Sequence, residues 1–413
     1  MPTMSVNSAH THRARTLAAA VALGAAVLLV SGCAQAGTAG SGSAGDGKGT
    51  APVKVGLVYS RTGPLAAYGK QYIEGFRAGL NYATEGTGKV DGHPIEITER
   101  DDAGDASKAV AAGKDLIGKG TKILAGSTDS GVALQMAPLA AQNKVLFIDG
   151  PAATDALTGI NKYTFRSGRQ SYQDTLTAAA MLGDAKGKKV TVLAQDSTFG
   201  QANVEAVKAV LGGEGAAVSS VLAPPSATDL TPFARQVAAA RPDLVFVAWA
   251  GATAPALWTA LDQQGVTTAS KVTTGLAGTA SYPVFGAGGQ KITFLAHYFP
   301  GAARTPAEKA MTESVEKAGG TPDLFTPDGF TAAQMIVHAV QGSATDTDTM
   351  VKSLEGWTFD GVKGKEQIRA EDHALLQPMF QARLKGSGST AEPELIRTLP
   401  MDKVAPPVKP LAG

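Results

Sequence analysis

Two successive blocks of alternating strand and helix patterns constrain the fold of this chain more than any other feature. In each block, short β-rich runs alternate with segments whose apolar residues recur at helical spacing. Such alternation builds parallel sheets with helices on both faces. Two blocks of about 120 residues each therefore predict two Rossmann-like α/β lobes rather than one large sheet. The predicted strands span residues 53–59, 95–98, 122–125, 145–148, 190–194, 217–222, 244–248 and 271–274, with a last strand near 379–384.

Three loops that follow predicted strands carry candidate binding residues, because ligands of open parallel sheets bind beyond the carboxyl ends of the strands. The first loop presents Tyr68 at the mouth of a helix, and in the second Ser130 is placed to cap a helix. The third loop is built of small residues and ends at Thr154, which opens a further helical turn. Two helix N-termini that converge on one cleft would bind an anion without a cationic side chain. The loops span residues 62–69, 126–131 and 150–154.

The start of the chain has the features of a bacterial lipoprotein signal. An uncharged apolar run at 17–30 follows Arg13 and Arg15 and leads into Cys33, the only cysteine of the 413 residues. We expect residues 1–32 to be removed and Cys33 to carry lipid, which would hold the protein on the outer face of the cell membrane. Residues 33–51 are mostly Gly, Ala, Ser and Thr and predict a flexible tether. The alternatives are an ordinary secretory peptide and a short buried helix that happens to precede a cysteine.

Charge and motif content exclude several function classes. Without Arg13 and Arg15, 35 basic residues face 36 acidic ones, so nothing favours nucleic-acid binding. Residues 42–49 approach a phosphate-binding loop, but Gly49 stands where Ser or Thr is required, and no cofactor is expected. The acidic cluster of Asp101, Asp102 and Asp105 lacks the spacing of a calcium loop, so no metal site is expected.

Several motifs, taken in their order along the chain, resemble the type I solute-binding proteins of the leucine/isoleucine/valine family. The resemblance implies the type I periplasmic-binding-protein fold, a monomeric two-lobed clamp with a three-segment hinge near Gln170, Phe299 and Asp360. It implies an N-terminal lobe of residues 52–170 plus 300–358 and a C-terminal lobe of 171–299 plus 359–400. Independently of the resemblance, the Pro-rich end of the chain at 401–413 predicts a surface tail. The partners implied are a small-molecule solute and the permease and ATPase subunits of an ABC importer. The motifs are Val55-Gly56-Leu57, residues 62–69, Gly126 with Ser130, Pro151-Ala152-Ala153-Thr154, Tyr163 to Arg166, Tyr298-Phe299-Pro300, and Asp372-His373 with Pro378.

The same resemblance assigns roles to individual residues. In the N-terminal lobe, the matching positions hold an amino acid's α-carboxylate, and a tyrosine lines the same pocket. In the C-terminal lobe, one aromatic residue matches a side chain that closes over the ligand, and a Trp-Ala pair follows a strand that ends at the cleft. The implied ligand-binding residues are Tyr68, Ser130, Ala152, Ala153, Thr154, Phe199, Trp249, Ala250 and Ala277.

Ala277 marks a departure from the family pattern. Members that bind amino acids carry an acidic residue there, which pairs with the α-ammonium, whereas residues 275–278 contain no acid. Burying an ammonium without a counter-charge costs several kcal/mol. We therefore expect a carboxylate, amide or similar polar head on an apolar or aromatic body, unless another acid such as Asp196 or Asp262 reaches the cleft.

Two alternatives remain open at this point. A serine hydrolase could use Ser130 with a base drawn from His93, His297, His338 or His373, but no Gly-x-Ser-x-Gly elbow surrounds Ser130. We expect no catalytic residues. A surface receptor that senses a ligand with the same clamp is the nearer alternative, and the genes next to this one would distinguish it from a transporter component.

Overall fold

The computed structural model describes residues 50–412. The predicted leader, the lipidation site Cys33 and most of the predicted tether lie outside these residues. Within 50–412, no helix has the length and apolar character needed to cross a membrane.

A six-stranded sheet forms the framework of the N-terminal lobe. Its strands are β1 Val53–Tyr59, β2 Lys89–Val90, β3 His93–Asp101, β4 Ile123–Gly126, β5 Leu146–Asp149 and β6 Thr164–Arg166. They lie in the order β2-β3-β1-β4-β5-β6, and every neighbouring pair is parallel except β2 and β3. Along β1, Val55 and Leu57 pack into one hydrophobic cluster and Val58 into another, as expected for a strand covered on both faces.

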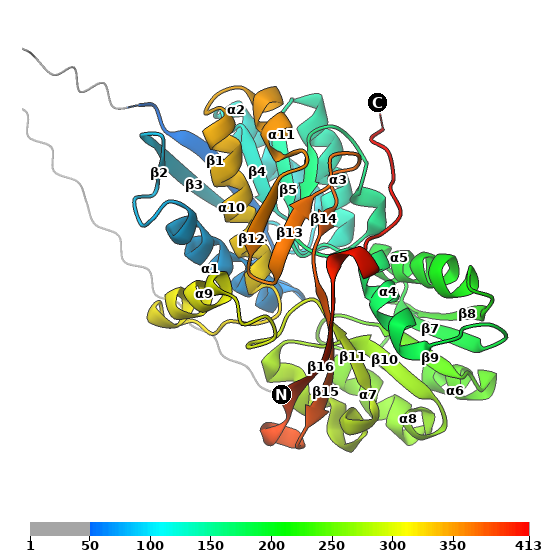
Figure 1. Ribbon diagram of the computed structural model, residues 1–413. Helices are drawn as coiled ribbons and strands as arrows, with labels where there is room; N and C mark the ends of the chain where they lie inside the picture. The colour runs from blue at the N-terminus through cyan, green and yellow to red at the C-terminus, as the bar shows by residue number, and fades with distance from the viewer. Residues whose placement is uncertain (1–49, 413) are drawn as a thin grey trace, which may run out of the picture. The chain divides into compact units, whose positions relative to one another are not determined.

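Helices cover both faces of this sheet, and a small antiparallel sheet packs beside them (Figure 1). One face packs against α1, α10 and α11, and the other against α2 and α3. The helices are α1 Ala66–Ala83, α2 Ala106–Gly118, α3 Ser130–Gln142, α9 Pro306–Lys317, α10 Thr326–Gly342 and α11 Thr347–Leu354, and the small sheet consists of β12 Thr358–Gly361, β13 Gly364–Ile368 and β14 Leu375–Leu376.

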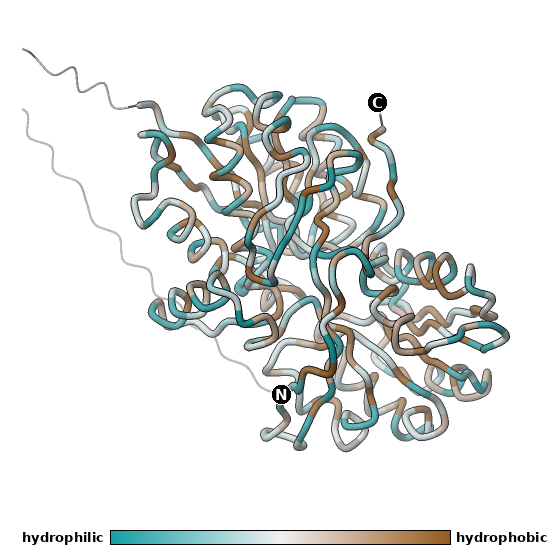
Figure 2. The backbone as a smooth tube through the Cα atoms, viewed as in Figure 1, coloured by the Kyte–Doolittle hydropathy of each residue, from teal (hydrophilic) through white to brown (hydrophobic). Residues whose placement is uncertain are grey.

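A seven-stranded sheet forms the C-terminal lobe. Its strands are β7 Lys189–Gln195, β8 Ala217–Ala223, β9 Leu244–Ala248, β10 Lys271–Gly275, β11 Thr293–Ala296, β15 Met379–Lys385 and β16 Glu392–Leu399. Five strands are parallel in the order β11-β10-β9-β7-β8, and β15 and β16 extend the β11 edge in antiparallel fashion. Figure 2 shows hydrophobic residues on the strands of both lobes.

The C-terminal lobe also has helices on both faces of its sheet. The helices α4 and α5 pack in one hydrophobic cluster, and α6, α7 and α8 in another. They are α4 Ser171–Leu182, α5 Thr198–Val207, α6 Thr231–Ala240, α7 Ala254–Gln263 and α8 Val266–Ala269. Segments of 3₁₀- or π-helix lie at Asp155–Leu157, Lys208–Gly212, Thr279–Lys291, Gly388–Thr390 and Met401–Lys403.

The chain passes between the two sheets three times, and one crossing differs from the prediction. The first lies between β6 and α4, and the second between β11 and α9. The sequence predicted the third near Asp360, with residues 359–400 in the C-terminal lobe. In the structure Phe359, Ile368 and Leu375 pack in the hydrophobic cluster of β1, α10 and α11, so the third crossing lies between β14 and β15. The hairpin of β12 and β13 stays with the N-terminal lobe because its apolar face is buried there.

The C-terminal tail returns to the N-terminal lobe after β16. Val404 is fully buried, and beyond it Arg369 donates hydrogen bonds to the carbonyl oxygens of Pro406 (2.7 Å) and Pro407 (3.2 Å). The backbone N–H of Ala412 donates to the Gly159 carbonyl at 2.9 Å. The predicted surface tail is therefore held against the lobe by specific contacts.

Candidate functional site

A pocket of about 460 Å³ lies where the carboxyl ends of the two parallel sheets face each other. Its N-terminal-lobe wall is built from the loops after β1, β4 and β5. Its C-terminal-lobe wall is built from the loops after β7, β9, β10 and β11. Both sheets therefore present the end that binds ligands in open α/β folds.

The structure places seven of the nine predicted ligand-binding residues in the lining of this pocket. Three come from the N-terminal lobe and four from the C-terminal lobe. They are Tyr68, Ser130 and Ala153, and Phe199, Trp249, Ala250 and Ala277.

Ala152 and Thr154 do not line the pocket. Their carbonyl oxygens accept hydrogen bonds from the buried guanidinium of Arg166, from Nη2 at 2.6 Å and from Nη1 at 3.0 Å. The Thr154 hydroxyl accepts from the backbone N–H of Ala156 and so caps the turn at Asp155–Leu157. Arg166 thus holds this loop from behind, and of its predicted residues only Ala153 faces the pocket.

The helix cap predicted at Ser130 is one residue too late. Asp129 is the N-cap of α3, because its Oδ1 accepts hydrogen bonds from the N–H groups of Gly131 (2.8 Å) and Val132 (3.1 Å). Ser130 is the first residue of the helix and lines the pocket with 4% of its surface exposed. Its hydroxyl therefore does not cap the helix.

Aromatic side chains from both lobes surround the pocket. The centre of the Tyr68 ring lies 4.6 Å from the centre of the Phe325 ring. Phe325 also lines the pocket but was not among the predicted ligand-binding residues. Burial raises the pKa of Tyr68, so its phenol stays protonated at neutral pH. On the opposite wall, Trp249 Nε1 donates to Thr253 Oγ1 at 3.0 Å, which fixes the indole, and Phe199 also belongs to the lining. The body of a bound solute would lie among these rings.

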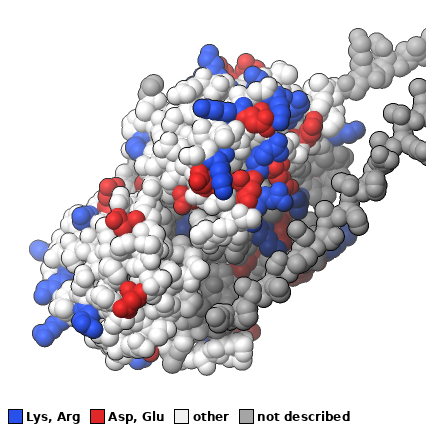
Figure 3. Space-filling view, turned by 180° about the vertical axis from the view of Figure 1, so that it is seen from behind, with Lys and Arg blue, Asp and Glu red and all other residues white. Residues whose placement is uncertain are grey.

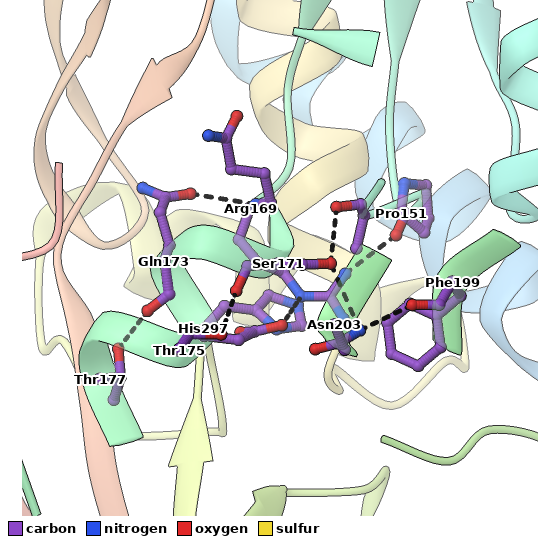
Figure 4. Close-up of polar contacts among 12 residues, drawn as sticks. Pro151, Arg169, Ser171, Gln173, Thr175, Thr177, Phe199, Asn203 and His297 are labelled. Atoms are coloured by element: carbon purple, nitrogen blue, oxygen red, sulfur yellow. Dashed lines mark hydrogen bonds and ion pairs between the residues drawn. The ribbon is translucent and has the colours of Figure 1, made fainter. Parts of the chain in front are cut away.

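Three polar residues of the lining, Arg169, Asp174 and His297, were not among the predicted ligand-binding residues, although His297 was considered as a catalytic base. Arg169 lies on the first crossing and Asp174 in the first turn of α4, whereas His297 directly follows β11 at the start of the second crossing. Arg169 Nη1 donates to the Pro151 carbonyl at 3.0 Å, as Figure 4 shows, and Arg169 Nε lies 3.4 Å from Asp174 Oδ2. The predicted crossings near Gln170 and Phe299 could have indicated them, because crossing segments lie at the boundary between the lobes.

Asp129 and Asp174 also remove the premise of the predicted specificity. The expectation of a solute without an ammonium required that no other acid reach the cleft. Asp196 accepts from Gln201, and Asp262 accepts from Thr267, and neither lines the pocket. Asp129 and Asp174 do line it, so the missing acid at Ala277 no longer excludes an amino acid.

His297 adds no charge to the pocket. Burial lowers the pKa of His297 well below its ordinary value, and the nearby cations Arg169 and Lys363 lower this pKa further. The imidazole is therefore neutral at pH 7. Its Nε2 lies 3.8 Å from Asp328 Oδ2 on α10.

The polar groups considered for catalysis and metal binding are used structurally. Within residues 50–412, no hydrogen bond joins the Ser130 hydroxyl to a histidine. His338 stacks on Trp357, and His373 stacks on Phe165. No group of three potential ligands among these residues could hold a metal ion. The acidic cluster accepts hydrogen bonds from backbone N–H groups of its own loop and of the loop after β1, and Asp105 caps α2.

Comparisons with known proteins agree with this geometry. A family model described as periplasmic binding protein matches residues 52–390. The chain is similar to the crystal structure of an ABC-type branched-chain amino acid transporter from Rhodopseudomonas palustris, with 33% identity, coverage of 87% of this chain and 99% of that chain, and a TM-score of 0.73. A solute-binding protein from R. palustris in complex with 4-hydroxybenzoate shares the fold at 22% identity, with coverage of 84% and 97% and a TM-score of 0.77. Among curated proteins, Leu/Ile/Val-binding protein homolog 3 of Brucella melitensis is 25% identical over 309 residues, which cover 74% of this chain and 83% of the relative.

Proposed function

Since the chain belongs to the periplasmic binding protein family, and within it to the branched-chain amino acid type, we propose that it is the extracytoplasmic solute-binding component of an ABC importer. Its relatives are solute-binding proteins, and this chain is likewise a binding protein and not an enzyme. The observation that carries the proposal is the pocket between the carboxyl ends of the two sheets, whose lining comes from both lobes.

The solute we propose is a small carboxylate-bearing or amide-like molecule with an apolar or aromatic body. The pocket of about 460 Å³ suits a molecule of this size. The N-terminus of α3, with Ser130, favours an anionic head, and Tyr68, Phe199, Trp249 and Phe325 favour an apolar body. Relatives of similar fold were solved with 4-hydroxybenzoate and with benzoate, and one from Brucella ovis is described as a leucine-, isoleucine-, valine-, threonine- and alanine-binding protein.

Capture would proceed by closure of the lobes about the three crossings. A solute that contacts both walls binds the closed arrangement more tightly than the open one, and so shifts the population toward closure. The closed form would be the state that the permease recognises. Lipidation at Cys33 would keep the protein at the outer face of the membrane that contains this permease.

A thermal-shift panel tests the proposal on protein that begins near Ala51, since residues 50–412 belong to one compact unit. The panel pairs leucine, valine and phenylalanine with the same skeletons without the amino group, and adds 4-hydroxybenzoate, amides and urea. A solute at a hundredfold its Kd stabilises the folded state by about 2.7 kcal/mol, which raises the unfolding temperature measurably. A shift with at least one acid or amino acid supports the proposal, and no shift with any member contradicts it.

A further inference from the structure

The pocket in which the polar head of the proposed solute would bind is lined by one permanently charged cation. Of the residues that line the pocket in the described part of the chain, Arg169 is the only lysine or arginine. His297 is neutral at pH 7, because burial lowers its pKa. The positive potential of the pocket therefore comes mainly from Arg169, because the Gly131 and Val132 N–H groups at the start of α3 already donate to the Asp129 carboxylate.

Arg169 is held in a fixed position before any solute arrives. Its Nη1 donates to the Pro151 carbonyl at 3.0 Å, and its guanidinium lies 5.6 Å from the centre of the Phe325 ring. On its other side, Asp174 Oδ2 lies 3.4 Å from Nε, which is longer than an ordinary N–H···O hydrogen bond. A guanidinium held in this way loses little conformational entropy when it binds a ligand.

The hydrogen bonding around Arg169 is incomplete without a solute. Within residues 50–412, three buried polar atoms here have no hydrogen-bond partner: Arg169 Nε, Asp174 Oδ1 and His297 Nε2. The Arg169 and Asp174 side chains are only 11% and 5% exposed, and that of His297 only 4%. Buried polar atoms in folded proteins are almost always satisfied, so this cluster on the pocket wall indicates a polar ligand group.

Each of the two carboxylates in the lining already has a partner within the protein. Asp129 uses Oδ1 to cap α3 through Gly131 and Val132. Asp174 lies against Arg169 itself, and burial raises the pKa of Asp174 while Arg169 lowers it. Since Pro151 belongs to the loop that also presents Ala153, the guanidinium and this loop approach the same part of the pocket (Figure 4).

We propose that Arg169 binds the anionic head of the solute directly, as a specificity-determining residue positioned by Pro151 and Asp174. This inference rests on the proposed function, because it assumes that solutes bind in this pocket. A guanidinium makes shorter and stronger hydrogen bonds to a carboxylate than to a neutral carbonyl. The protein should therefore prefer a carboxylic acid over the primary amide of the same skeleton.

The test compares matched pairs by calorimetric titration: 4-hydroxybenzoate with 4-hydroxybenzamide, phenylacetate with phenylacetamide, and leucine with leucinamide. We expect the wild-type protein to bind at least one acid tenfold or more tightly than its amide. Arg169→Gln should lower this ratio at least tenfold, mainly through weaker binding of the acid. Arg235→Gln, at an exposed position on α6, should leave the ratio unchanged.

The ratio of two dissociation constants is insensitive to a general loss of stability, because both solutes bind the same folded fraction. If Arg169→Gln cannot be obtained folded, Arg169→Lys tests the same inference. Lysine keeps the positive charge but lacks the planar guanidinium, so the preference for acid over amide should be intermediate. An unchanged acid-to-amide ratio in the Arg169 variant overturns this inference alone. A wild-type protein that binds no member of the pairs, or of the panel above, overturns the proposed function and this inference with it.

Discussion

Asp323 of the N-terminal lobe accepts hydrogen bonds from the backbone N–H of Thr279 in the C-terminal lobe, at 2.9 Å to Oδ2 and 3.1 Å to Oδ1. The same carboxylate accepts from Gln71 on α1 at 3.1 Å, which anchors it to its own lobe. Thr279 follows Ala277 by two residues, so this contact fastens the loop where the family's acid is missing. The two lobes are therefore joined by a side-chain contact in addition to the three crossings.

Removal of this contact should weaken binding of every solute by a similar factor. A hydrogen bond to a charged acceptor contributes about 1.5–3 kcal/mol, so Asp323→Ala should raise the Kd roughly tenfold or more if the contact stabilises the closed form. The order of preference among solutes should not change, because Asp323 does not line the pocket. Asp360→Ala, at a side chain 87% exposed, is the control. Solute-dependent losses in Asp323→Ala would contradict a role in closure alone.

Alanine substitutions at Ser130 and Thr154 should affect two different properties, solute binding and protein stability. Ser130 lines the pocket, whereas the Thr154 hydroxyl caps a helical turn. Ser130→Ala should weaken binding of an acidic solute roughly tenfold, through the loss of one hydrogen bond to a charged group, with the unfolding temperature nearly unchanged. Thr154→Ala should instead cost about 1 kcal/mol of stability and leave the Kd within a factor of two or so. Titration and chemical denaturation of both variants would check this, and the reverse pattern would show that Thr154 contacts the solute.

Lys363 and Asp328 form a fully buried pair, with Nζ 3.5 Å from Oδ1. Burial raises the pKa of Asp328 from 3.8 to about 6, and Lys363 opposes that rise. Because the folded-state pKa exceeds the ordinary value, the folded protein binds more protons than the unfolded chain between pH 4 and 6. The contribution of Asp328 to stability therefore falls as pH rises through this window and is constant above it.

Lys363→Met should destabilise the protein by about 3–5 kcal/mol at neutral pH, because it leaves Asp328 buried without its cation. Without Lys363, the pKa of Asp328 rises further, so the loss should be larger at pH 8 than at pH 5. Denaturant titrations at both pH values measure this difference. Lys365→Met, at a surface lysine 68% exposed, should change stability by less than about 0.5 kcal/mol. Equal losses for Lys363→Met at pH 5 and pH 8 would rule out protonation of Asp328 as the cause.

Most of the parallel strands were predictable from the sequence because they are short apolar runs that alternate with helical patterns. The sequence did not predict the parallel strands β6 and β11, the edge strand β16 or the small strands β2, β12, β13 and β14: β6 has three residues, and the hairpin of β12 and β13 alternates over four to five residues only. The third crossing was misplaced for the same reason, since nothing local shows which lobe buries Phe359.

In the site, Tyr68 and Ser130 could be found because their loops follow β1 and β4, two strands that were predicted. Arg169, Asp174 and His297 were missed as ligand-binding residues because Arg169 and Asp174 follow β6 and His297 follows β11, and neither of these strands was predicted. Their place in the pocket depends on how the two lobes meet, which is a property of tertiary packing. The absence of an acid at Ala277 could be recognised in the sequence, but the presence of another acid, Asp174, in the pocket could not.

The contact between α1 and α10 depends on glycine at position 75. A Cβ atom on Gly75 would overlap with the carbonyl oxygen of Thr326, at the start of α10. Gly75→Ala should therefore destabilise the protein by about 1–3 kcal/mol or more, although alanine is the better helix former. Gly118→Ala is the matched control, since a Cβ atom there meets nothing within 4 Å, and it should be neutral or slightly stabilising. Denaturant titration distinguishes the two, and a neutral Gly75→Ala would mean that the helices can separate without cost.

The substitution Gly159→Ala tests whether the C-terminal tail is part of the folded structure. Its φ of +70° is costly for other residues, and a Cβ atom would also overlap with the carbonyl oxygen of Lys409 in the tail. In the full chain Gly159→Ala should therefore cost more than the ~1–2 kcal/mol expected for the left-handed backbone alone. In a chain that ends at Val404 only that backbone cost remains, so the loss should be smaller by about 1 kcal/mol or more. Denaturant titrations of the four proteins give this difference as a coupling free energy. A coupling near zero would show that the tail does not pack on Gly159 in solution, whereas the expected value would make the tail a further connection between the lobes.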